Sequence, residues 1–171
     1  MKKISGLLLV GAVVAVTLTA SVVASSAASG SGSSGGADDV LRFDTMFPVV
    51  APFTGATNPV HGVPGAGAPW SIDGAQGRLE SDGDIDVRVE GLVLVSNGQN
   101  PAAQFQAIVT CDTVVNGAVT TINVITDPFP ADIAGNSRIR DTIALPDPCL
   151  SPTVFVGPVG GAPRWFAVTG R

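Results

Sequence analysis

Tyrosine is absent from this chain of 171 residues, and aromatic residues together make up only 5% of it. Glycan- and protein-binding surfaces are usually rich in such side chains. The chain also has a single histidine, His61, and it lacks the Gly-x-Ser-x-Gly pattern of a nucleophile elbow. We therefore expect no catalytic residue, no metal centre and no cofactor, although a hydrolytic pair of carboxylates would leave no recognisable motif.

Lysine is confined to positions 2 and 3, so the rest of the chain carries seven arginines against 14 acidic residues. A net acidic domain with no basic cluster in its sequence neutralises phosphates poorly, which argues against nucleic acid and anionic membranes as partners. A contact with the cell envelope or with a glycan stays open, and the sequence does not identify the partner.

The N-terminal residues have the pattern of an export signal. Lys2 and Lys3 precede an apolar run over 4–20, and small residues follow over 24–28. This pattern predicts a secretory signal peptide over residues 1–28 and a secreted or extracytoplasmic protein. Because the apolar run over 4–23 is about as long as a bilayer-spanning helix, an uncleaved membrane anchor is the alternative.

Two cysteines, Cys111 and Cys149, lie beyond this signal. An even number of cysteines in an oxidising compartment predicts one disulfide between them. Their spacing does not match the Cys-x-x-Cys motif of reactive thiol pairs.

Composition divides the remaining chain into three parts. Residues 29–37 are rich in glycine and serine and are predicted to form a flexible linker. Residues 38–69 contain five prolines, which favour an extended segment on the surface. Within this segment, residues 40–43 could pair with a sheet edge of the same domain or of a neighbouring protein. Residues 70–171 are predicted to form the folded domain.

Short strands and tight turns dominate residues 70–171. Residues 84–90 alternate between polar and apolar side chains, and Asp82-Gly83 and Asn116-Gly117 are typical of hairpin turns. Residues 92–95 are apolar on both faces and are expected in the middle of a sheet. The pattern predicts an all-β fold, a single antiparallel β-sandwich, with an immunoglobulin-like arrangement preferred and a jelly roll second. No tryptophan lies between the two cysteines, however, so the immunoglobulin marker is missing.

Two groups of residues are candidate binding sites. Asp82, Asp84 and Asp86 could hold a weakly bound cation, or they could form a solvated strand face. Trp70 and Trp165 each follow a Gly-Ala-Pro turn, and they could form an exposed platform for a sugar ring or close the ends of the core.

Three segments resemble a group of small exported bacterial proteins of unknown function: residues 65–72, residues 91–95 and residues 165–170. This resemblance covers roughly residues 63–170 and implies an exported bacterial β domain, without a specific activity. We expect a non-enzymatic structural or binding module of the cell envelope or the secretome. The alternatives are a carbohydrate-binding module that uses Trp70 and Trp165, and a hydrolase with an unrecognised carboxylate site.

Overall fold

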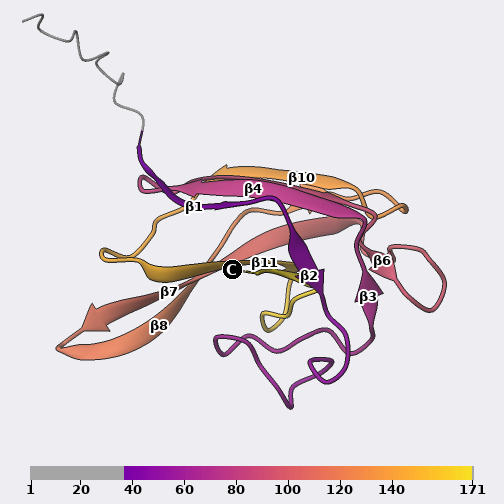
Figure 1. Ribbon diagram of the computed structural model, residues 1–171, viewed down its shortest axis with the longest axis horizontal. Helices are drawn as coiled ribbons and strands as arrows, with labels where there is room; N and C mark the ends of the chain where they lie inside the picture. The colour runs from indigo at the N-terminus through magenta and orange to yellow at the C-terminus, as the bar shows by residue number, and fades with distance from the viewer. Residues whose placement is uncertain (1–36, 171) are drawn as a thin grey trace, which may run out of the picture. The chain divides into compact units, whose positions relative to one another are not determined.

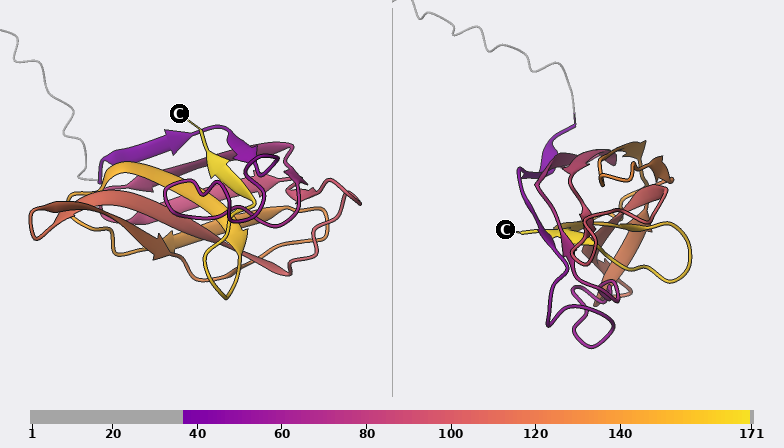
Figure 2. Two further views of the ribbon diagram at one scale, coloured as in Figure 1. Left: turned by 90° about the horizontal axis from the view of Figure 1, so that it is seen from below. Right: turned by 90° about the vertical axis from the view of Figure 1, so that its right-hand side faces the viewer.

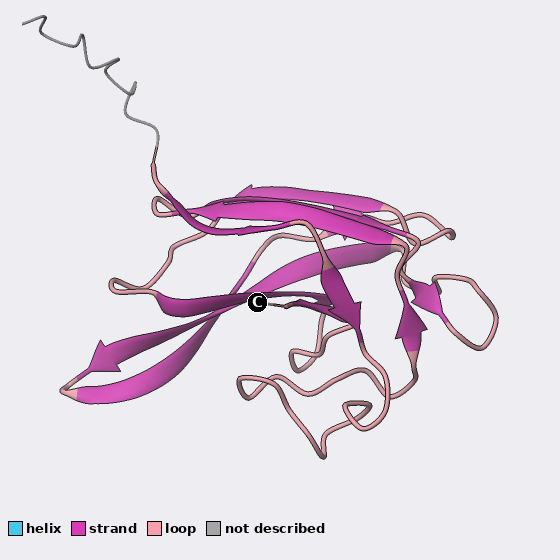
Figure 3. Ribbon diagram, in the orientation of Figure 1, coloured by secondary structure: helices cyan, strands magenta, loops and turns pink. Residues whose placement is uncertain are grey.

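The computed structural model describes residues 37–170. The expected signal over 1–28 and nearly all of the 29–37 linker lie outside the described residues. Within residues 37–170 the secondary structure consists of strands and contains no helix (Figure 3). The all-β sandwich predicted from the sequence is confirmed.

Two main antiparallel sheets form the sandwich (Figure 1). The four-stranded sheet has the order β1-β4-β5-β10, and the larger sheet has the order β2-β12-β11-β7-β8, with β9 also paired to β7. The strands of the smaller sheet are β1 (Asp39–Phe43), β4 (Gly74–Glu80), β5 (Asp84–Glu90) and β10 (Ser137–Thr142). Those of the larger sheet are β2 (Met46–Pro48), β7 (Gln104–Val115), β8 (Ala118–Ile125), β9 (Phe129–Pro130), β11 (Leu150–Pro158) and β12 (Ala167–Thr169). A third, two-stranded sheet pairs β3 (Trp70–Ser71) with β6 (Val93–Leu94).

The two predicted hairpins are present. Gly83, with φ of 95°, lies in the turn between β4 and β5, and Asn116 and Gly117, with φ of 51° and 80°, form the two-residue turn between β7 and β8. Positive φ at both central residues is the requirement of a type I′ turn, which explains the Asn-Gly sequence there.

The main core lies between the two sheets, which Figure 2 shows from two further directions. Ile85, Val87 and Val89 of β5 are buried, as the alternation of that strand predicts. The larger sheet contributes Phe105, and side chains on both faces of β7 are buried. Cys111 points into this core and forms the expected disulfide with Cys149, which directly precedes β11.

Residues 38–69 were expected to form an extended segment ahead of the domain, and the structure places two strands there. β1 pairs with β4, and β2 pairs with β12, where Met46 lies opposite Thr169. The segment therefore adds an edge strand to each of the two main sheets of the same domain. Its later part contacts the 165–166 region, because the Ala66 N–H donates to the Trp165 carbonyl over 2.9 Å.

One finer prediction is wrong. Residues 92–95 do not form a central strand; only Val93 and Leu94 are in a strand, and Val95 is 60% exposed. The chain passes between the sheets early: β1, β4 and β5 lie side by side in the smaller sheet, whereas β2, which follows β1 in the chain, lies in the larger one.

Candidate functional site: the arginine face

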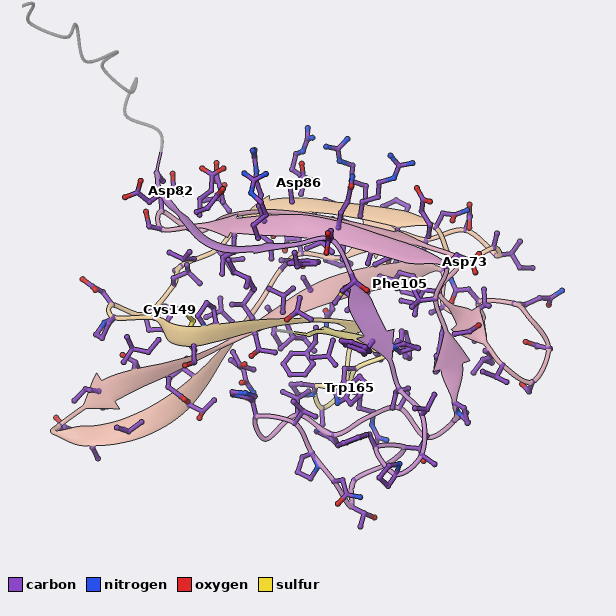
Figure 4. All side chains as sticks on the ribbon, in the orientation of Figure 1. Asp73, Asp82, Asp86, Phe105, Cys149 and Trp165 are labelled. Atoms are coloured by element: carbon purple, nitrogen blue, oxygen red, sulfur yellow. A yellow bond between two sulfur atoms is a disulfide. The ribbon has the colours of Figure 1, made fainter. Side chains whose placement is uncertain are left out.

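The outward side of the four-stranded sheet carries a cluster of arginines. Strand alternation turns Leu79, Val87 and Ile139 inward, so their neighbours point to solvent. Five of the six arginines in residues 37–170 lie on this side, and Figure 4 shows the nitrogen-tipped side chains around Asp86. We call this surface the arginine face; its arginines are Arg42, Arg78, Arg88, Arg138 and Arg140.

The register of the strands aligns these residues in two rows across the sheet. In the first row Arg42 lies opposite Arg78, Arg78 opposite Asp86, and Asp86 opposite Arg140. In the second row Arg88 lies between Gln76 and Arg138. Two cross-strand pairs therefore join like charges, Arg42 with Arg78 and Arg88 with Arg138, an arrangement that destabilises a sheet unless anions compensate it.

Asp86 is the acid at the centre of the arginine face. Its two carboxylate oxygens accept from Nε and Nη2 of Arg138 over 3.1 and 2.8 Å, and one of them also accepts from Arg140 over 3.0 Å. These hydrogen bonds, that from Arg138 foremost, hold the pKa of Asp86 below its ordinary value. One carboxylate thus serves two guanidinium groups.

The other three arginines pair with acids at the margins of the face. Arg78 pairs with Glu80 over 3.1 Å, Arg88 with Glu90 over 2.7 Å, and Arg42 with Asp39. The side chains of all five arginines are at least half exposed. Exposed ion pairs contribute about 0–1 kcal/mol each, so an incoming anion can replace these marginal partners.

An open depression of about 770 Å³ lies on this face, over strands β1, β4, β5 and β10. Its charged lining consists of the five arginines with Asp44 and Asp86. Guanidinium groups bind carboxylates and phosphates through bidentate hydrogen bonds. The depression presents several guanidinium groups on one flat surface. The arrangement suits recognition of an anionic ligand by its charge.

The three aspartates of the predicted cation site do not come together as one group. Asp82 and Asp84 lie with Glu80 around the β4–β5 turn, where one oxygen of each falls within 4.8 Å of the others. Asp84 also accepts a hydrogen bond from the Thr142 hydroxyl over 2.6 Å. Asp86 belongs to the arginine pair instead, so two of the three predicted residues share a location.

Trp70 and Trp165 are buried, with 3% and 2% of their surface exposed. Trp70 stacks on Phe166 with ring centroids 3.8 Å apart, and the Trp165 indole N–H donates to the Val63 carbonyl over 3.1 Å. The two rings form no exposed platform, so the prediction of a sugar-binding surface at these side chains is wrong. The alternative, in which both rings fill the ends of the core, agrees with the structure.

The arginine face was missed by the sequence analysis, which found no basic cluster. The arginines are spread over about 100 positions of the sequence, from Arg42 to Arg140, and only the pairing of four strands brings them together. The available signal was local: Arg138 and Arg140 alternate with Ile139, as Asp86 and Arg88 alternate with Val87.

The chain matches no protein-family model, no curated protein and no solved structure. Within the described residues there is no helix of the length and apolarity that crossing a membrane requires. The disulfide is the structural feature that bears on location, because such bonds persist in oxidising compartments.

Proposed function

We propose that this protein is a non-enzymatic, extracytoplasmic binding module that binds a carboxylated glycan of the cell envelope through its arginine face. The observation that carries the proposal is the pairing of like charges, Arg42 opposite Arg78 and Arg88 opposite Arg138. A bound carboxylate between two such guanidinium groups replaces repulsion by attraction.

The dimensions of the face favour a linear, moderately charged polymer. Neighbouring strands lie about 4.8 Å apart and alternate residues along one strand about 7 Å apart, so the two rows form a narrow strip across four strands. Acidic side chains border this strip. Glu80 and Asp84 lie along one side of it, and Glu90 lies along the other. A densely charged, wide polyanion such as duplex DNA would meet these acids, whereas one glycan chain fits between them.

The hydrolase alternative gains no support from the described carboxylates. Glu80, Asp82 and Asp84 approach one another at a turn that is largely exposed, whereas hydrolysis of a glycoside requires two carboxyl groups on opposite sides of a bound sugar ring. Asp86, at the centre of the depression, accepts hydrogen bonds from two arginines, which keep it ionised and unsuited to donate a proton.

Binding to polygalacturonate at low salt tests the proposal, with neutral dextran as the reference polymer. We expect the full chain to bind polygalacturonate and to lose affinity as sodium chloride rises, because the contacts are screened charges. R138A should weaken binding by about tenfold, which corresponds to one charge-assisted contact of about 1.4 kcal/mol. R164A is the matched control, because it removes an exposed arginine outside the face.

D86N provides a test in the opposite direction. It removes the central acid and frees Arg138 and Arg140 for the ligand, so affinity for polygalacturonate should rise. Equal losses for R138A and R164A would show that binding follows net charge and not the face. Tighter binding of a short DNA duplex than of polygalacturonate would contradict the assignment to a glycan.

A further inference from the structure

The strand orders of the two main sheets end at β1, β10, β2 and β8, and one of these four end strands lacks the usual protection. Exposed edges in natural proteins carry charges, proline or only a few residues, which prevents pairing with other chains. β1 and β10 carry charged side chains, and β2 has three residues and ends at Pro48. β8 is eight residues long and contains no charged residue, no proline and no glycine.

The open edge of β8 has free main-chain groups at alternate residues. In a hairpin with a two-residue turn, the residues that flank the turn form the hydrogen-bonded pair, here Val115 and Ala118. The even-numbered residues of β8 therefore bond to β7, and the Thr126 N–H continues this alternation by donating to the Ala107 carbonyl over 3.0 Å. The odd-numbered residues 119–125 direct their N–H and C=O groups away from the sheet.

The side chains of these odd-numbered residues match those of a second β8 strand when the two strands pair in antiparallel orientation. If a two-fold axis passes at Ile122, Val119 lies opposite Ile125 of a second copy, and Thr121 lies opposite Asn123 of that copy. Val119 is 74% exposed and Ile125 is 41% exposed, so this register covers two exposed apolar side chains in each copy. Apolar residues then meet apolar residues, and polar residues meet polar residues.

We propose that two copies of this chain form a two-fold symmetric dimer by antiparallel pairing of their β8 strands, which makes one continuous sheet. Charge does not oppose pairing at this edge, because β8 carries no charged residue that would face its own copy. In Figure 1 the β7–β8 hairpin extends away from the other strands, so a partner strand has access to it. This inference concerns an edge that is separate from the arginine face, and it does not depend on the proposed function.

Two double substitutions test the register with matched changes to the fold. V119K/I125K places lysines opposite each other twice in the dimer, whereas V119K/I125E places a lysine opposite a glutamate twice. Both variants remove the same two apolar side chains. Analytical ultracentrifugation of the full chain should show a dimer for the unaltered protein, and the dissociation constant of V119K/I125K should exceed that of V119K/I125E by about tenfold.

The remaining outcomes would contradict the proposal. A protein that stays monomeric at every soluble concentration would show that the β8 edge does not pair with a second copy. Equal dissociation constants for the two variants would place the contact elsewhere or in another register. An open-ended oligomer would exclude the two-fold contact, because antiparallel pairing of one edge closes at two copies.

Discussion

Arg138 donates from Nε and from Nη2 to the two carboxylate oxygens of Asp86, which lies 52 positions earlier in the chain. This contact joins β10 to β5 on the outer side of the four-stranded sheet, where main-chain pairing already holds the two strands together. Its contribution is therefore electrostatic: it neutralises the centre of an otherwise basic surface and makes that surface sensitive to the protonation of one carboxyl group.

The first prediction concerns the pH dependence of stability. Because the folded-state pKa of Asp86 lies below its unfolded value, Asp86 stabilises the fold above the unfolded pKa, near 4, and this contribution is lost as the pH falls through the folded pKa. D86N should lower the free energy of unfolding at pH 7 by about 1 kcal/mol. It should also reduce the decline of stability below about pH 4, measured by urea unfolding.

Part of that decline should persist in D86N. Hydrogen bonds from the main chain and side chain of Asn136 also hold the pKa of Asp132 below its ordinary value. The acid sensitivity that remains should therefore fall further in D86N/D132N. A D86N protein with the same acid decline as the unaltered protein would contradict the assignment to Asp86.

The second prediction compares two glycines with positive φ, Gly83 in the β4–β5 turn and Gly98 in the loop between β6 and β7. Gly83 and Gly98 both have positive φ, of 95° and 66°. A Cβ at Gly83 would overlap the backbone oxygen of Ile143, whereas a Cβ at Gly98 would meet open space. G98A should cost about 1 kcal/mol, and G83A should cost about 3 kcal/mol or more, because the backbone around Ile143 must shift.

Thermal unfolding with a denaturant series measures both variants. Similar costs for G83A and G98A would mean that the backbone at Ile143, just after β10, moves aside without a penalty. The two substitutions are chemically identical, and the two glycines differ in the space around them and in φ, which lies closer to the left-handed minimum at Gly98.

The third prediction concerns Thr110, whose buried hydroxyl has no hydrogen-bond partner in the described part of the chain. Valine has nearly the same shape and no polar atom, so T110V should leave the fold intact and raise the free energy of unfolding by about 1 kcal/mol. A lower unfolding midpoint in urea for T110V would show that the hydroxyl has a partner, such as a bound water molecule.

The fourth prediction concerns the disulfide between Cys111 and Cys149. Removing the cross-link in C111A/C149A should lower the stability by about 2–5 kcal/mol, because the unfolded chain gains conformational freedom and the core loses two sulfur atoms. Mass analysis under non-reducing conditions should find two hydrogen atoms fewer than in the reduced protein. Two alkylatable thiols in protein recovered from an oxidising compartment would contradict the pairing.

The sequence predicted those features that depend on neighbouring residues. The β5 alternation, the Asn116-Gly117 turn and the inward direction of Cys111 follow from period and turn chemistry, and the structure has all three. The sequence could not predict which strands lie side by side, because pairing across long separations leaves no local signal. Val93 and Leu94 illustrate this limit: their apolar character suggested a central strand, but their partner is the short β3.

The candidate site shows the same limit more strongly. Asp82, Asp84 and Asp86 are close in sequence and were considered together, yet Asp86 has its closest charged partners in β10. The two tryptophans were considered both as an exposed platform and as rings that close the ends of the core, and the structure buries both of them. Burial and charge pairing at these positions are decided by distant strands.

The pairing of β2 with β12 has a consequence for the order of folding. Met46 lies opposite Thr169, so the larger sheet cannot be completed until the chain has been synthesised through residue 169. The β4–β5 and β7–β8 hairpins can form early, whereas β2 must wait for its partner. Such late closure keeps the growing chain incompletely folded throughout its synthesis, which is the condition in which a polypeptide can be threaded through a narrow export channel.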